Sequence, residues 1–423
     1  MTPPRDRRRT LIVQLGTFVL ILGIPDGAVG VLWPSLRQSF HLALDDLGVL
    51  TIAGTGLYFA GGLLGDRAKR LLGVGFTMVG SCLVALAALV SWSVAPDWLT
   101  VLLAVATLGL ARGVIDAVVN AEAALEGGVR RLGFLHASWA IGGTLGPILV
   151  AAAAGGPGSW RLAVAVVAAG VVLLLPFAFA DAGRRTTAAG RSSGPGLGSR
   201  EGTEGAGSLD AGSPAPAGSA PIAARQPQQV LPAPDRRRLV LAVTVVAFFV
   251  YVAAEAGPIA WGYTYLILDR RLAHLVAAGA LAAFWAALTA GRFGLAVLGE
   301  RAPGTSVLEV SCLLVVTGTA LFWLLPGALA IAGLPVAGLG SAAVFPMLMA
   351  LTPVRIGTRA TGRAVGASIA AAALGGPIAV ALLGLAAAHF GVGVLGPCMF
   401  GLAVALYGVN RTLSLVTRKV SSW

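Results

Sequence analysis

Long apolar runs, separated by short polar segments, recur along the whole sequence. A helix needs about 20 apolar residues to cross the hydrocarbon core of a bilayer. Such runs predict helices at residues 10–34, 46–65, 73–94, 99–123, 131–154, 161–181, 239–265, 275–298, 305–325, 327–351, 362–388 and 393–413. Pro326 and Gly327 alone separate the ninth run from the tenth. The pattern therefore predicts an all-α membrane protein with twelve transmembrane helices.

One segment breaks this pattern, because residues 182–238 are rich in Gly, Ala, Pro and Ser. Such a composition cannot bury enough apolar surface to fold, so we interpret the segment as a flexible cytoplasmic linker. It divides the chain into an N-terminal six-helix bundle at 1–181 and a C-terminal six-helix bundle at 239–423. A regulatory role is the alternative to a simple connection between the two bundles.

The composition supports the same class of protein. Of the 423 residues, 57% are hydrophobic and 11% are charged, and the mean hydropathy is +0.86. These values are typical of a multi-pass protein in contact with a lipid bilayer. The net charge of +12 could suit a nucleic-acid partner. The arginines lie in short loops between apolar runs, however, so we attribute them to membrane orientation and expect no nucleic-acid partner.

Arginine and lysine residues are divided unequally between alternate loops. If the N-terminus is inside, most of these residues fall on the inner side, and the outer loops hold Arg37, Arg161, Arg270 and Arg271. Inner loops of membrane proteins carry the excess of positive charge. The distribution predicts a protein of the cell's inner (plasma) membrane with both termini in the cytoplasm. We expect it to be a monomer.

Two acids occupy equivalent places in the two halves. A charge at mid-bilayer costs about 2.5–3.5 kcal/mol, so it requires a partner or a function. Counting about 1.5 Å per residue places Asp26 of the first run and Glu255 of the seventh at similar depth. Both stretches carry helix breakers, at 25–27 and at 257–258. Interrupted helices near the midplane indicate a transporter binding site.

The fourth run carries a polar stripe at helical spacing, formed by Arg112, Asp116 and Asn120. We predict that Arg112 and Asp116 pair along the helix, which lowers the cost of burying both. His136 and Trp139 share a face of the fifth run, and His136 lies at the depth of Asp116. Intramembrane ionisable groups favour a functional role. A structural ion pair, and for His136 a satisfied interfacial histidine, are the alternatives.

Aromatic residues of the seventh run share a helical face with Glu255, and these are Tyr251, Trp261 and Tyr265. We interpret them as the lining of a solute cavity, although aromatic residues on a span more often pack or form an interfacial belt. The predicted solute-binding residues are Asn120, His136, Trp139, Tyr251, Glu255 and Trp261. Three further charged residues lie near span ends, where they are expected to reach the interface: Glu122, Arg292 and Glu309.

A charged segment follows the second run and reads Gly62-Leu63-Leu64-Gly65-Asp66-Arg67-Ala68-Lys69-Arg70. A weaker copy at 297–302 places Glu300 where the first copy has Asp66, so the chain consists of two related halves. The first copy resembles the signature loop between the second and third helices of the major facilitator superfamily. Lys69 stands where that family usually has Gly. The resemblance implies a secondary transporter with a gating loop that contains Gly62, Gly65, Asp66, Arg67 and Arg70.

Within this superfamily, the stretches at 27–34, 116–121, 135–147 and 338–346 resemble the fucose/glucose-type sugar–proton symporters and related bacterial permeases. In those symporters an acid of span 1 and an acid of span 4 serve substrate binding and proton coupling. These positions match Asp26 and Asp116. Arg112 departs from this branch and is similar to the span-4 arginine of drug–proton antiporters. Residues 133–147 fit most of the span-5 antiporter signature.

The expected function is secondary active transport of a sugar-like or other small polar organic solute by alternating access. The resemblance implies coupling to protons through Asp26, Asp116 and Arg112. A proton-driven efflux antiporter for amphipathic compounds is the main alternative, and a non-transporting sensor with a transporter fold is a third hypothesis. The sequence contains no nucleotide-binding loop, metal-ligand cluster or nucleophile triad, so we expect no enzyme activity, no metal and no cofactor beyond the proton gradient.

Overall fold

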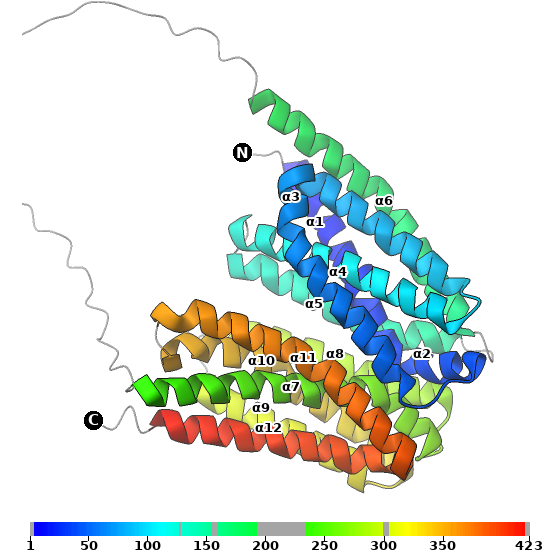
Figure 1. Ribbon diagram of the computed structural model, residues 1–423, viewed down its shortest axis with the longest axis vertical. Helices are drawn as coiled ribbons and strands as arrows, with labels where there is room; N and C mark the ends of the chain where they lie inside the picture. The colour runs from blue at the N-terminus through cyan, green and yellow to red at the C-terminus, as the bar shows by residue number, and fades with distance from the viewer. Residues whose placement is uncertain are drawn as a thin grey trace, which may run out of the picture.

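The computed structural model describes residues 4–126, 128–153, 159–192, 234–298, 304–356 and 358–418. Helices make up nearly all of these residues (Figure 1). In chain order they are α1 (Pro4–Thr17), the π-helix η1 (Phe18–Gly23), α2 (Ile24–Phe40), α3 (Asp46–Ser93), α4 (Trp98–Glu126), α5 (Gly128–Ala153), α6 (Ser159–Ser192), α7 (Pro234–Leu268), α8 (His274–Leu298), α9 (Gly304–Leu324), the 3-10 helix η3 (Gly327–Ala332), α10 (Gly333–Ile356), α11 (Thr358–Phe390), the 3-10 helix η4 (Val392–Val394) and α12 (Leu395–Arg418).

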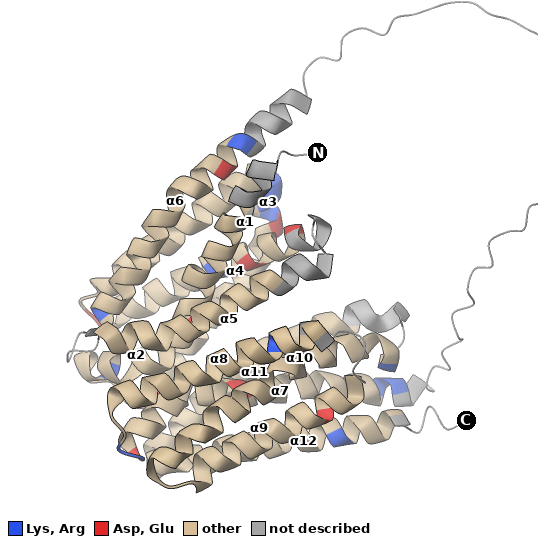
Figure 2. Ribbon diagram, turned by 180° about the vertical axis from the view of Figure 1, so that it is seen from behind, with Lys and Arg blue, Asp and Glu red and all other residues tan. Residues whose placement is uncertain are grey.

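Within the described residues, eleven helical segments are long and apolar enough to cross a membrane. Charged side chains are sparse along them (Figure 2). The predicted break between the ninth and tenth runs is confirmed, because α9 ends at Leu324 and Gly327 adopts a φ of 53°. Nearly all described residues of the predicted runs are helical, and two of the runs, 46–65 and 73–94, fall in one helix.

The longest helix, α3, has 48 residues and a single break inside it. At about 1.5 Å per residue, a straight helix of this length would extend for more than twice the thickness of a bilayer core. Gly73 interrupts it with φ 72° and ψ 164°, a conformation that favours glycine. The segment 62–70 was predicted as a loop, and that prediction is wrong. It forms the last turns of helix before Gly73, where an Asp66–Arg70 pair at i,i+4 supports the helix.

The helices gather in two groups, α1–α6 and α7–α12, with both chain ends on the same side (Figure 1). We call that side the terminus end and the opposite side the loop end. The predicted linker overlaps helices at its edges, since α6 extends to Ser192 and α7 begins at Pro234. The remainder of the linker, at 193–233, lies outside the described residues, as do Glu300 and Arg301 of the second charged copy.

The two helix breakers expected near the central acids behave differently. Around Pro25 the first span is irregular, because the π-helix η1 immediately precedes α2. Proline lacks an N–H and crowds the preceding turn, and a π segment is one way to relieve that conflict. The seventh span runs as one α-helix through Gly257 and Pro258. The interruption predicted there is therefore wrong.

The two groups pack against each other tightly at the loop end. A methyl group on Gly30 of α2 would overlap the carbonyl oxygen of Ile259 in α7. A methyl group on Gly48 of α3 would lie 2.6 Å from the Cα of Ala381 in α11. Toward the terminus end, by contrast, the two groups of helices diverge (Figure 1). The halves are thus in close contact at the loop end and lie further apart near the terminus end.

Candidate functional site

Three helices of the first group meet at Asp26, which lies in the first turn of α2. Arg112 of α4 forms an ion pair with its Oδ1, and Trp139 of α5 donates from Nε1 to its Oδ2 at 2.9 Å. Arg112 also donates to the carbonyl of Leu22 at 3.1 Å. The Arg112 and Asp26 side chains are 19% and 32% exposed. The carboxylate is therefore held by a cation and an indole N–H in a partly buried place, where such interactions are stronger than in bulk water.

The ion pair differs from the sequence prediction, in which Arg112 paired with Asp116 along α4. Asp116 instead accepts hydrogen bonds from Tyr58 of α3 at 2.7 Å and from Asn120 of α4 at 2.8 Å. Arg112 reaches across to α2 because that side of α4 faces the first span. Tyr58 was not predicted as a site residue, since a single tyrosine in an apolar run gives no signal of its partner.

Four central residues lie at one depth. Asp26 precedes the end of α2 by 14 residues and Trp139 precedes the end of α5 by 14. Arg112 follows the start of α4 by 14 residues, and Glu255 precedes the end of α7 by 13. A rise of 1.5 Å per residue puts all of them about 20 Å from the loop end. The equal depth predicted for Asp26 and Glu255 is confirmed.

Glu255 is held by its own helix. Tyr251 donates its hydroxyl to the Glu255 carboxylate at 2.7 Å and also lies 3.2 Å from the carbonyl oxygen of Ser341 in α10. Tyr251 is 1% exposed, so in this conformation it positions Glu255 rather than presenting a surface. Trp261 is fully buried and donates to the carbonyl of Val380 in α11 at 3.0 Å. The structure therefore separates Trp261 from the central charges.

Arg292 of α8 joins the two groups of helices. Its guanidinium carbon lies 4.9 Å above the ring of Trp139, and its charge acts on Glu255. Trp139 also meets Trp285 of α8 edge to face at 5.1 Å. The expectation that Arg292 would reach the interface is therefore wrong. The expectation used only the position of Arg292 near the C-terminal end of α8. Helical side chains lean toward the N-terminus of their helix, so the Arg292 side chain points away from that end and toward the centre.

His136 of α5 is exposed and lies edge to face with Phe18 at 6.4 Å. The charges of Arg292 and Asp116 both act on it. The depth shared by His136 and Asp116 is consistent with the sequence prediction. His136 therefore borders the central charged residues rather than packing in the core.

The two acids predicted near span ends, Glu122 and Glu309, each contact another helix. Glu122 of α4 is 6% exposed and accepts a hydrogen bond from Gln14 of α1 at 3.2 Å, so the prediction that it would reach the interface is wrong. Glu309 of α9 pairs with Arg411 of α12 at 2.7 Å, with both side chains partly exposed. These contacts connect helices within one group.

The signature segment lies apart from these charges, near the terminus end. Asp66 and Arg70 pair with each other and are 72% and 64% exposed, and Arg67 is also exposed. Gly65 faces α4, where a methyl group would lie 2.9 Å from the Cβ of Ala117. Gly62 faces open space. In this conformation the segment's charges make no described contact with the second group of helices.

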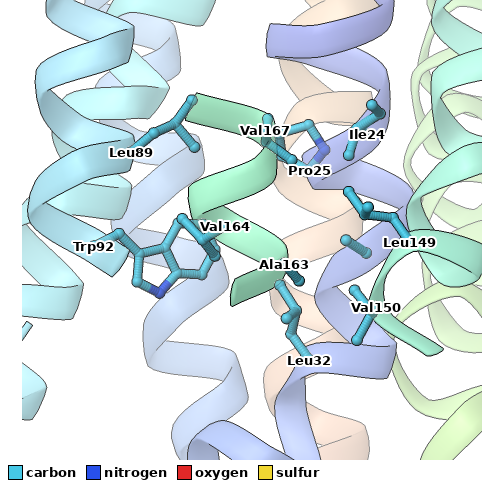
Figure 3. A pocket seen from close by; sticks show the side chains of 11 residues that line it. Ile24, Pro25, Leu32, Leu89, Trp92, Leu149, Val150, Ala163, Val164 and Val167 are labelled. Carbon is cyan, nitrogen blue, oxygen red and sulfur yellow. The ribbon is translucent and has the colours of Figure 1, made fainter. Parts of the chain in front are cut away.

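A small apolar cavity lies between the first, third, fifth and sixth spans (Figure 3). Ile24, Pro25, Leu149 and Val164 are among its lining residues. Because its walls are apolar, it is a packing space next to the irregular first span rather than a site for a polar solute. A second, more open hollow lies between α5 and α8, lined by Ile141, Thr144, Leu145, Ala286, Thr289, Ala290 and Phe293.

Comparison with solved structures finds the same fold. A bacterial homologue of the human lysosomal transporter Spinster, inward-facing and unoccupied, matches with a TM-score of 0.66 at 14% identity, covering 99% of this chain and 97% of its own. The same homologue in its occupied, inward-facing form matches with a TM-score of 0.65 at 13% identity, covering 99% and 97%. A mutant of the nucleoside transporter NupG matches with a TM-score of 0.68 at 13% identity, covering 96% and 99%.

No curated protein matches the chain. The model of the Major Facilitator Superfamily matches residues 15–380, which is most of the sequence. Together with the long apolar helices, this match identifies a multi-pass membrane protein. The chain belongs to the Major Facilitator Superfamily.

Proposed function

We propose that the protein is a secondary active transporter that moves a small polar organic solute by alternating access, coupled to protons. Its architecture is two pseudo-symmetric bundles of six transmembrane helices, in which α3 contributes two spans on either side of Gly73. The family match and the transporters of the same fold support solute transport. The proposal includes cytoplasmic termini, which makes this conformation open to the cytoplasm.

The observation that carries proton coupling is the ion pair between Arg112 and Asp26. It links the fourth span to the first within a layer of charges about 20 Å from the loop end. Intramembrane ionisable groups are costly and mark ion or proton pathways. Because Arg112 lies one helical turn from Asp116, the same guanidinium has a second acid within its range of motion.

Protonation of Asp26 or Asp116 then changes which acid Arg112 favours. A neutral Asp26 no longer attracts the guanidinium, and the contact between α2 and α4 loosens. A change in this contact biases the equilibrium between the two access states, and the bias is the coupling. The segment around Asp66 acts as a gate, since its exposed charges can exchange the Asp66–Arg70 pair for partners across the halves when the terminus end closes.

Uptake into proteoliposomes under an imposed pH gradient tests the proposal. A solute panel that includes sugars and nucleosides identifies the transported molecule first. The variants D26N and D116N are expected to lose acceleration by the gradient while binding of the solute persists. E309Q, which alters an acid pair away from the central layer, is the matched control and should retain it. Full pH-dependent uptake by D116N and D26N would refute this mechanism.

A second candidate is proton-driven efflux of an amphipathic compound. Arg112, which is similar to the span-4 arginine of antiporters, favours it, as does the apolar hollow between α5 and α8. Amphipathic solutes carry an apolar portion that such a surface accommodates. The direction of coupling separates the two candidates. Collapse of the proton gradient in cells would lower accumulation of a symported solute and raise accumulation of an exported one.

A further inference from the structure

Arg292 lies among the central charges without an acid in contact. Arg112 and Arg411, two other arginines of the spans, form ion pairs with Asp26 and Glu309. Within the described part of the chain, Arg292 forms no ion pair with an acid. Its guanidinium lies close enough to the Tyr251 hydroxyl to interact with it, and its Nε is buried without a partner. A membrane protein rarely keeps an unpaired cation at this depth unless a ligand or a pathway uses it.

The orientation of Arg292 excludes a purely interfacial role. An arginine that serves the headgroup region extends its side chain toward the nearer end of its helix. The guanidinium of Arg292 instead stacks on Trp139 at 4.9 Å. Trp139 is fixed at the central layer by its hydrogen bond to Asp26 at 2.9 Å. Arg292 therefore points into the site, toward the seam between the two halves.

The residues around the guanidinium suit a ligand that has an anionic group and an apolar or aromatic body. A planar guanidinium matches the two oxygens of a carboxylate or phosphate. Trp139, which is only half-buried, offers an aromatic face next to it, backed by the edge of Trp285 at 5.1 Å. His136 is exposed nearby and feels the charge of Arg292. An anionic group joined to an apolar or aromatic body fits this arrangement.

The charge balance favours a single anion. Glu255 is the acid whose carboxylate the Arg292 charge acts on, but the two form no ion pair. The Tyr251 hydroxyl lies between them, since it donates to Glu255 and also interacts with Arg292. A ligand anion in contact with Arg292 would therefore supply the acid partner that none of the described residues provides. We propose that Arg292 is the anion-binding residue of the central site, and that the solute is an organic anion with one carboxylate or phosphate group, which binds Arg292 while the apolar body of the solute packs on Trp139.

This inference rests on the proposed transport function and names the solute class for the same site. It is tested on the purified full-length protein by thermal melting in the presence of sodium benzoate or phenyl phosphate. Benzamide serves as the neutral analogue of benzoate, and sodium chloride matches the ionic strength. The variants are R292Q and R292K. R161Q is the matched control, because Arg161 also stacks on a tryptophan, Trp160 at 4.4 Å, but lies near the loop end.

We expect at least one of the two anions to raise the melting temperature of the wild type and of R161Q, since a ligand that binds the folded state stabilises it. Benzamide should have no such effect. R292Q should weaken the apparent affinity about tenfold or more, equivalent to the loss of a charge-assisted contact. R292K keeps the charge but lacks the planar fork, so it should be intermediate, and it provides a second variant if R292Q does not fold.

Three results would overturn the inference: equal stabilisation by benzamide, unchanged affinity in R292Q and R292K, or no stabilisation by either anion. Failure here is separable from failure of the proposed function. Proton-driven flux of a neutral solute that persists in R292Q would refute anion recognition and leave proton-coupled transport intact. Benzoate binding that depends on Arg292, without any flux that responds to a proton gradient, would support anion recognition and refute proton-coupled transport.

Discussion

Substitution of Gly30 by alanine should shift the protein away from the conformation described here. Gly30 of α2 faces the backbone of α7, and an added methyl group would overlap the carbonyl oxygen of Ile259. This contact joins the two halves at the loop end and is absent from any packing within one half. The overlap therefore penalises the state in which the loop end is closed and leaves the alternative state unaffected.

The magnitude follows from the cost of overpacking. Insertion of a methyl group into a well-packed contact costs about 1–3 kcal/mol. Applied to one of two states, that cost changes their ratio by about 5-fold to 150-fold. If the closed loop end is favoured by a similar margin in the wild type, G30A should populate both states or reverse the preference.

Distances between spin labels at the loop end provide the assay. After replacement of the three native cysteines, labels at Leu99 of α4 and Leu275 of α8 report the separation of the halves. These side chains are 64% and 73% exposed, so the labels should not disturb packing. The wild type should give one short distance, and G30A should add or favour a longer one.

Two glycines serve as controls for this experiment. Gly279 of α8 faces open space, so G279A should resemble the wild type. Gly27 of α2 packs on the backbone of Gly143 within the same group of helices, so G27A should lower the melting temperature without lengthening the distance. An unchanged distance distribution in G30A, or a loss of stability like that of G27A, would refute the reasoning.

Three further variants test local features outside the central layer. The N–H and hydroxyl of Thr100 hold the pKa of the Asp97 carboxyl below its usual range. The ionised Asp97 carboxylate therefore stabilises the protein at neutral pH, and this stabilisation is lost as pH falls through the lowered pKa. The melting temperature of D97N should fall less between neutral and acidic pH than that of the wild type. R411Q should lower the free energy of unfolding by about 1 kcal/mol or less, because the Arg411–Glu309 pair is partly exposed. G73A should cost about 1–3 kcal/mol in a denaturation experiment, since Gly73 has φ 72° and ψ 164°.

The segment at 62–70 illustrates what a local pattern leaves open. Its charges and glycines resemble a known loop, yet the residues are helical up to Gly73. Leu63, Leu64 and the Asp66–Arg70 pair favour helix, and nothing before Gly73 forces the chain to turn. The motif resembled the family's signature, whereas the location of the break depended on Gly73, whose φ is positive.

Partners of the buried charges could not be predicted for a different reason. Arg112 has acids in range both along its helix and across to α2, and the structure selects Asp26. Tyr58 reaches Asp116 because glycines allow α3 and α4 to pack closely, as where a methyl group on Gly113 would overlap the carbonyl of Tyr58. Which faces of two helices meet is set by packing over the whole bundle, and sequence spacing does not encode it.

The sequence by itself determined the positions and the number of the apolar runs, and the common depth of Asp26 and Glu255. These properties follow from the thickness of the bilayer and the fixed rise of a helix, which are local and do not depend on neighbours. Tertiary structure alone decided that Arg292 stacks on Trp139 and that the halves close at the loop end. Both depend on contacts between residues far apart in the chain. The length and direction of a side chain determine which of several residues at the same depth it contacts.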